Sequence, residues 1–239
     1  MTEPTEAARA RGALFRMVAA LLDYPLPETR QVLADGRALD AIADTLHQLG
    51  MQTPCPELPK ADQRLTSLQI GYTNTFLSGR RGKPRVPLVA SAYKQLVAGA
   101  TTGAFLLNIQ AFYKHFGLKA AEADEGHVEE PDHLVTMLEF CTLLCHREER
   151  AFDKQLDPTP YQRAQRDFLA RYLVPLSQAI QERYQAGDAE LDVVLGWLVH
   201  HLPDWCRVQQ QQLEQAISVS ETSGDRLIPT TTITQGLWD

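Results

Sequence analysis

The stretch Glu129-Glu130-Pro131-Asp132-His133-Leu134 opens a long amphipathic segment that ends near Gln155. Proline suits the first position of a helix, because its missing N–H would have no partner inside the helix there. Acidic side chains suit the same place, since they face the positive end of the helix dipole. Capping does not explain why an aspartate and a histidine stand together at the start of an apolar helix. This cluster is therefore a candidate functional site.

Most of the remaining chain also spaces its apolar residues with helical period. The segment 7–22 shows this spacing and stops at Tyr24-Pro25-Leu26-Pro27, where prolines end a helix. The expected helices cover residues 7–22, 28–35, 39–49, 62–76, 91–117, 131–155, 158–186 and 188–217. No pair of strands and no internal repeat is evident. The sequence predicts an all-α protein with a single helical-bundle domain over residues 1–217.

The last part of the chain has a different character. The polar run from Gln209 to Gln212 is expected on a solvated helix face. Residues 218–239 are rich in Thr and Ser without helical period, which predicts a flexible C-terminal tail.

Composition excludes several classes of function. The 239 residues are 44% hydrophobic and 22% charged, which is typical of a globular protein with a sizeable core. The net charge of −7 argues against nucleic-acid binding, which needs a basic face. The acidic N-terminus lacks the apolar core of a secretory signal, and the uncharged run 95–113 is too polar for lipid. We expect a cytoplasmic protein without stable membrane insertion.

Motifs for catalysis or metal binding are incomplete. Glu130-x-x-His133 matches one element of the di-iron bundles, but these need a second such element, and none occurs. Cys141 and Cys145 share a helix face among apolar residues, which favours buried free thiols over a metal site. Phosphate-binding loops and nucleophile elbows are absent from the sequence. We expect no catalytic residue, no metal and no cofactor.

Two patches remain as candidates for function. One runs from Tyr72 and Phe76 into the basic loop 78–87 and on to Ser91 and Tyr93. The other is the turn 129–134. Each taken singly also has a structural explanation, because a tyrosine can be a core residue with a polar tip and an aspartate can cap a helix.

Together, in this order and spacing, the two patches resemble the TorD/DmsD/NarJ family of cytoplasmic chaperones, which mature molybdenum-containing oxidoreductases. The resemblance runs from about residue 10 to residue 210, and the Pro-Asp-His element at the start of a helix is the family's most specific mark. Within this family, the sequence most resembles the chaperones that serve the type II branch of the dimethyl-sulfoxide-reductase family. The matching segments are Tyr72-Thr-Asn-Thr-Phe76, the loop to Pro87, Ser91-Ala-Tyr93, Phe112-Tyr113, Phe116-Gly-Leu118, Glu130-Pro-Asp-His-Leu134 and Leu138-Glu-Phe140.

The resemblance implies a TorD-like helical bundle and a non-catalytic role. Such a chaperone binds the apo catalytic subunit of a molybdenum enzyme at its N-terminal region, often a twin-arginine leader. It assists insertion of the molybdenum cofactor and restrains premature export. Members of the family occur as monomers or domain-swapped dimers. A leader offers arginines followed by an apolar stretch, so its receptor needs carboxylates beside an apolar groove.

On this basis Asp132 is expected to face an arginine, with His133 as an orienting hydrogen-bond partner. Glutamates before it would add charge, and aromatic side chains would form the apolar wall. The expected client-binding residues are Asp132, His133, Glu130, Glu129, Pro131, Tyr72, Phe76, Ser91 and Tyr93.

Other interpretations stay open at this stage. A metal-dependent hydrolase would use Asp132, His133 and His127. A structural subunit would remain in the mature complex, whereas a chaperone leaves. Direct contact with the molybdenum cofactor or a nucleotide has no phosphate-binding loop to support it.

Overall fold

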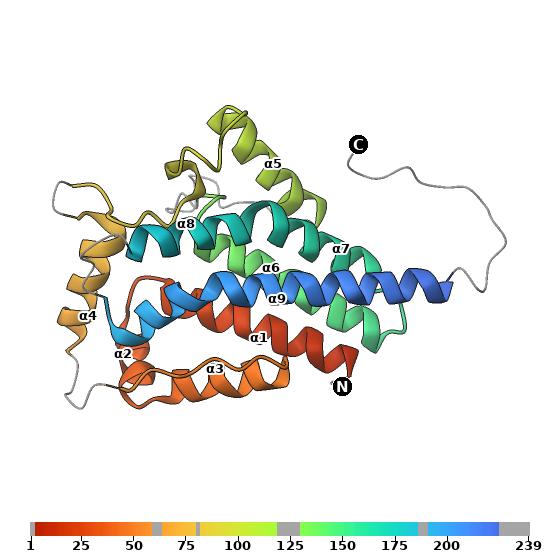
Figure 1. Ribbon diagram of the computed structural model, residues 1–239, viewed down its shortest axis with the longest axis horizontal. Helices are drawn as coiled ribbons and strands as arrows, with labels where there is room; N and C mark the ends of the chain where they lie inside the picture. The colour runs from red at the N-terminus through yellow and green to blue at the C-terminus, as the bar shows by residue number, and fades with distance from the viewer. Residues whose placement is uncertain (1–2, 59–63, 80–81, 119–129, 186–190, 225–239) are drawn as a thin grey trace.

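The computed structural model describes residues 3–58, 64–79, 82–118, 130–185 and 191–224 (Figure 1). These residues form helices and no strand, apart from an isolated antiparallel bridge between Val89 and His133, so the predicted all-α fold is confirmed. The α-helices are α1 (Pro4–Leu22), α2 (Pro27–Ala34), α3 (Arg37–Gln48), α4 (Leu65–Tyr72), α5 (Thr102–His115), α6 (Leu134–Asp153), α7 (Thr159–Phe168), α8 (Val174–Gln185) and α9 (Val193–Gly224). Short helical turns of other types are η1 (Thr73–Leu77), η2 (Ala90–Ala92) and η4 (Leu169–Leu173).

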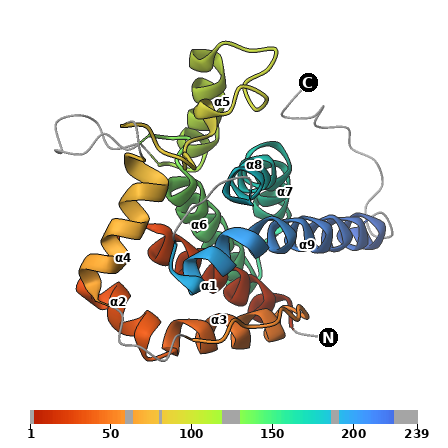
Figure 2. The ribbon, with the colours of Figure 1, turned by 60° about the vertical axis from the view of Figure 1, so that its left-hand side comes forward.

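The core lies between α1, α6 and α9, which run through the middle of the molecule (Figures 1 and 2). Helices α7 and α8 pack on α9, and α3 packs on α1. The contact of α1 with α6 is the most extensive. It is also close, since a Cβ on Gly12 would lie 3.1 Å from Cβ of Cys145. The packing of α6 on α1 therefore holds the two helices close together.

The start of α6 differs from the prediction that Pro131 occupies the first helical position. The helix begins at Leu134, and His133 is its N-cap in an extended conformation. His133 also forms the bridge with Val89. Because this bridge keeps the residue extended, Pro131 and Asp132 lie in a turn before the helix, and the predicted helix start is wrong by about one turn.

The predicted helix from residue 91 is also wrong in its first part. Residues 90–92 form the single 3₁₀ turn η2, and α5 begins only at Thr102. The Thr101 hydroxyl oxygen caps α5 by accepting from the amide of Ala104. The predicted apolar stripe of α5 is part of the core, with Ile109 and Phe112 buried and Phe112 edge-on to Phe168.

The predicted helix 158–186 is interrupted by the π-helical turn η4. Pro175 has no N–H, so it cannot donate to the carbonyl one α-helical turn earlier. The amide of Val174 instead donates to the carbonyl of Leu169, five residues back. This widened turn joins α7 to α8 without ending the helical rod.

Helix α9 continues to Gly224, beyond the predicted end at residue 217. Ile217 is buried against the bundle, so tertiary packing supports α9 beyond the run Gln209–Gln212. Within the helix, the Ser218 hydroxyl donates to the carbonyl of Glu214. Residues 225–239 of the expected tail lie outside the described residues. Among the helices of the described residues, none is long and apolar enough to span a bilayer.

The polar run of α9 was expected to face solvent, but part of it holds a neighbouring segment. The Gln212 amide donates to the carbonyl of Leu49 at 3.0 Å, and Gln209 is fully buried against Met51. The indole of Trp205 donates to the hydroxyl of Thr53 farther along. Residues 49–54 therefore run along α9 as an extended strap, which explains why glutamines are needed there.

Candidate functional site

The loop 85–93 connects the two sequence patches through backbone hydrogen bonds. At one end, the carbonyl of Thr75 accepts from the amides of Arg85 and Val86 at 3.0 and 2.9 Å. At the other end, the amide of Leu134 donates to the carbonyl of Leu88 at 2.8 Å. The loop thus ties the end of η1 to the start of α6, and the structure brings the two predicted patches together.

Asp132 holds this loop in place from inside. Its side chain and backbone are 2% exposed. Its Oδ2 atom accepts from the amide of Ser91 at 2.7 Å, and its carbonyl accepts from the amide of Ala90 at 3.1 Å. A carboxylate that accepts a backbone N–H forms a strong, charge-assisted hydrogen bond. In this conformation the carboxylate of Asp132 is buried from solvent, so it is not open to a guanidinium of another chain.

His133 is half-buried and caps α6. Its Nδ1 atom accepts from the amide of Val135 at 3.3 Å, so this nitrogen carries no proton in the folded state. Burial lowers the pKa of His133, and the charges of Asp23 and Asp132 oppose that shift only in part. The ring is therefore a neutral hydrogen-bond acceptor that orients the first turn of the helix.

The expected aromatic wall lies mostly inside the core. Tyr72 and Phe76 are each 3% exposed and meet edge-to-face, with ring centroids 5.0 Å apart. The Tyr72 hydroxyl donates to the carbonyl of Leu22 at 2.9 Å, and burial raises its pKa. Tyr93 is 7% exposed and donates to the carbonyl of Pro87 at 2.8 Å. These side chains shape the site from behind.

The other predicted residues lie nearer the surface. Glu130 is exposed, and Ser91 and Pro131 are half-buried. The carbonyl of Pro131 accepts from the Tyr113 hydroxyl at 2.6 Å, which fixes the turn against α5. Glu129 lies outside the described residues, as does His127 of the hydrolase alternative.

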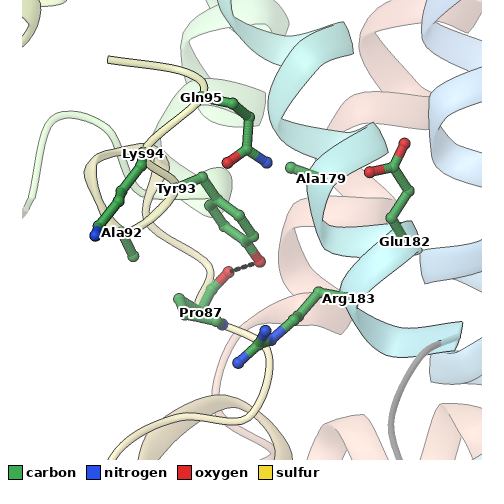
Figure 3. A pocket seen from close by; sticks show the side chains of 8 residues that line it. All are labelled: Pro87, Ala92, Tyr93, Lys94, Gln95, Ala179, Glu182 and Arg183. Atoms are coloured by element: carbon green, nitrogen blue, oxygen red, sulfur yellow. Dashed lines mark hydrogen bonds between the residues drawn. The ribbon is translucent and has the colours of Figure 1, made fainter. Parts of the chain in front are cut away.

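A cavity of about 490 Å³ lies between this loop region and α8 (Figure 3). Tyr93 and Gln95 extend toward α8 from the loop side, and Arg183 of α8 passes below the Tyr93 hydroxyl. The Arg183 Nε atom donates to the carbonyl of Arg85 at 2.9 Å, so α8 also holds the loop. Lys94 and Glu182 complete the charged lining.

A buried polar network, which no sequence motif predicted, lies near the other end of α6. Glu148, 2% exposed, pairs with Arg11 of α1 at 2.7 Å. Two glutamine amides of α7 donate to the same carboxylate, Gln162 at 2.9 Å and Gln165 at 2.7 Å. Burial raises the pKa of Cys145 to about 12, so its thiol is protonated and donates to Gln165. One signal was available: Glu148 falls four residues after Leu144, on the apolar face.

Side chains that could bind a metal do not cluster in the described parts of the chain. Within 3–58, 64–79, 82–118, 130–185 and 191–224, no group of three or more His, Cys, Asp and Glu could hold a metal ion. Asp132 and His133 engage backbone amides instead. The described geometry thus gives the hydrolase alternative no support.

Sequence comparison places the chain in a family. The family model described as nitrate reductase delta subunit matches residues 31–180. This match includes the loop 85–93, the Pro131–His133 turn and α6. The chain belongs to the nitrate reductase delta subunit family. The resemblance inferred from the sequence patches is thereby confirmed. No solved structure gives a significant match.

Several curated relatives of this delta subunit family member are named as assembly chaperone proteins. The dimethyl sulfide dehydrogenase assembly chaperone protein of Rhodovulum sulfidophilum is 41% identical over 170 residues, covering 71% of this chain and 67% of the relative. The selenate reductase assembly chaperone protein of Thauera selenatis is 32% identical, covering 75% of this chain and 90% of the relative. The perchlorate reductase assembly chaperone protein of Dechloromonas aromatica (strain RCB) is 29% identical, covering 73% and 77%.

Proposed function

We propose that the protein is an assembly chaperone for the catalytic subunit of a molybdenum oxidoreductase of the dimethyl-sulfoxide-reductase family. The observation that carries this proposal is its similarity to assembly chaperones of several reductases and a dehydrogenase. The site is compatible with it, because Asp132 and His133 accept backbone amides and thereby shape a surface. The protein acts by binding, without catalysis of its own.

The chaperone works in the cytoplasm, as a monomer or a domain-swapped dimer. It binds the N-terminal leader region of the apo subunit and holds it until the molybdenum cofactor is inserted, before export. A leader with arginines followed by apolar residues needs a surface that combines negative charge with apolar side chains.

The client surface is proposed to form around the loop 85–93 and the turn before α6. Buried residues shape it, with Asp132 holding Ser91 and with Tyr72, Phe76 and Tyr93 packed behind. The more exposed residues Glu130, Pro131 and His133 are proposed to reach the client. Glu129, which lies outside the described residues, is proposed to act with them. Pairing of Asp132 itself with an arginine requires the loop to open, because Asp132 is buried.

Affinity purification tests this function. The tagged chain is recovered from its native host growing with molybdate, and bound proteins and metals are measured in the same fraction. We expect a molybdoenzyme catalytic subunit that retains its N-terminal leader and lacks molybdenum. A chain that carries about one metal ion and no such partner would instead establish the hydrolase. Stoichiometric retention in the active, exported enzyme would establish a structural subunit.

Two variants sharpen the same experiment. Asp132→Ala releases the loop 85–93 and is expected to lower recovery of the catalytic subunit. Asp153→Asn removes an exposed carboxylate at the far end of the same helix and is expected to leave recovery unchanged. Equal loss in both variants would point to net charge and not to the proposed surface.

A further inference from the structure

The turn between α1 and α2 presents charge and apolar side chains together. Asp23 is an exposed carboxylate directly after α1. Tyr24 and Leu26 follow it and are 42% and 55% exposed, so they place apolar surface beside this carboxylate. Glu28 is exposed in the first turn of α2. Residues 23–28, here called the Asp23–Glu28 turn, thus carry an acidic group at each end and exposed apolar side chains between them.

The position of Asp23 concentrates negative potential. The C-terminal end of a helix carries partial negative charge, so it favours cations and disfavours carboxylates. The last turn of α1 holds no basic residue, and Asp23 has no ion-pair partner within the described parts of the chain. Its Oδ1 atom accepts from the amide of Tyr24 at 2.7 Å. A carboxylate kept unneutralised at this end of a helix is suited to an external cation.

The turn is held firmly beside the site already described. The Gln69 amide of α4 donates to the carbonyl of Pro25 at 3.0 Å, and the Tyr24 ring meets Tyr72 edge-on at 5.7 Å. Tyr72 in turn packs on Phe76 of η1, next to Thr75, whose carbonyl holds the loop 85–93. The turn is therefore a rigid extension of the proposed client surface.

Asp23 and Asp132 differ in what they can offer to a ligand. Asp132 is buried and already accepts the Ser91 amide, whereas Asp23 is exposed. Asp23 also accepts a backbone amide, from Tyr24 at Oδ1, but because it is exposed a guanidinium can approach it without moving the loop 85–93. Charge complementarity therefore favours Asp23 as the first carboxylate that a cationic peptide meets.

We propose that the Asp23–Glu28 turn receives the cationic part of the client leader, with Asp23 pairing with an arginine and with Tyr24 and Leu26 covering the apolar residues that follow. This inference rests on the proposed chaperone function. The partner is a peptide segment with a guanidinium beside an apolar run, the pattern that matches an exposed acid next to exposed apolar side chains.

Peptide binding in a double-mutant cycle tests the pairing. The probe is a synthetic peptide of the N-terminal segment of the catalytic subunit recovered with the tagged chain, titrated calorimetrically into the full-length protein. Asp23→Asn is expected to weaken binding about tenfold or more, because a charge-assisted hydrogen bond is lost. A peptide with glutamine in place of its arginines should bind wild type and Asp23→Asn equally. Asp153→Asn serves as the exposed acidic control.

The apolar part of the turn has its own test. Leu26→Ser is expected to weaken binding of the peptide several-fold. The salt dependence of binding should stay the same, because the change removes apolar area and no charge. Leu156→Ser removes a similarly exposed leucine, 61% exposed, at the other end of the bundle and should have no effect. Both positions are exposed, so both variants should keep the unfolding midpoint of wild type.

The outcomes separate this inference from the function on which it rests. If the peptide binds wild type and binds Asp23→Asn with the same affinity, the role of the turn is overturned. The chaperone function would still stand. Additive losses from Asp23→Asn and the arginine-free peptide would also overturn the pairing. A wild-type chain that binds no segment of the recovered subunit would overturn leader recognition and the pairing together.

Discussion

The two ends of α6 each bury a carboxylate but employ it differently. Asp132 and Glu148 are both 2% exposed. Glu148 accepts from three side chains, one of them the cation of Arg11. Asp132 accepts from backbone amides of the loop 85–93, and the ion pairs among described residues do not include it. One carboxylate joins helices, and the other positions a loop.

This difference separates stability from function along a single helix. The network around Glu148 joins α1, α6 and α7 deep in the core, where no client can reach it. The contacts of Asp132 lie under the proposed client surface. Substitutions at the two ends should therefore have different consequences: a loss of folding free energy at Glu148, and a smaller loss accompanied by a loss of client binding at Asp132.

The largest effect is expected for Glu148→Leu. This change leaves the buried guanidinium of Arg11 without its counter-charge and two glutamine amides without their acceptor. Leaving one member of a buried ion pair uncompensated costs about 3–5 kcal/mol of unfolding free energy. Urea denaturation followed by circular dichroism measures this loss.

The matched control replaces both charges. The double variant Arg11→Met with Glu148→Leu should recover part of the loss, because a packed apolar pair avoids the cost of a buried lone charge. A single variant as stable as wild type would show that the network contributes nothing, and the contrast between the ends of α6 would disappear.

The next effect is expected for Asp132→Ala. Removal of a charged hydrogen-bond acceptor costs about 1.5–3 kcal/mol, and the amide of Ser91 should then exchange its hydrogen faster. Client binding should fall in the same variant, because the loop 85–93 is no longer held in its position. Urea denaturation and hydrogen exchange resolved at Ser91 measure the two parts.

Glu130→Ala is the control for this second change. Glu130 is exposed two residues away, so its removal should alter stability by no more than about 0.5 kcal/mol. If the Ser91 amide exchanges its hydrogen at the same rate in Asp132→Ala as in wild type, Asp132 does not position the loop. This conclusion would hold whether or not client binding changed.

The same contrast explains what could be read from the sequence. Helical periodicity is a local property, so the all-α fold and the buried stripe through Ile109 and Phe112 were predictable. The grouping of Ser91 with Asp132 followed from the family pattern, and their hydrogen bond agrees with it. The partners of Glu148 come from residues 11, 162 and 165, and no local pattern announces such a set.

The predicted helix starts are wrong where contacts with a distant segment outweigh the local preference of the sequence for a helix. Pro131 is a good first residue for a helix, but the bridge from Val89 to His133 delays the start. The alanines and Ser91 of residues 90–92 favour a helix locally, but the Ser91 and Ala90 amides donate to Asp132. The burial of Asp132 could not be foreseen, because it depends on where that loop folds.

A moderate effect is expected for Tyr113→Phe. The Tyr113 hydroxyl donates to the carbonyl of Pro131 and so fixes the turn that carries Asp132. Loss of one neutral hydrogen bond costs about 1 kcal/mol, which a shift of the urea midpoint would record. Tyr24→Phe removes an exposed hydroxyl and should leave the midpoint unchanged. Equal shifts in both variants would mean that the Pro131 contact carries no stability.

The smallest effect is expected from protonation of His133. Burial lowers its pKa from the ordinary value of 6.5, with Asp23 and Asp132 as the charges that oppose this shift. An unfolded chain then takes up a proton more readily than the folded one, so the stabilising contribution is complete above pH 6.5 and is lost as the pH falls through the folded pKa. His133→Asn keeps a side-chain cap that does not titrate. The unfolding free energy of wild type, measured by urea denaturation from neutral pH down to about pH 5, should therefore fall more steeply than that of His133→Asn. Parallel pH profiles would show that loss of the His133 cap on protonation costs no stability, and that the start of α6 does not depend on this cap.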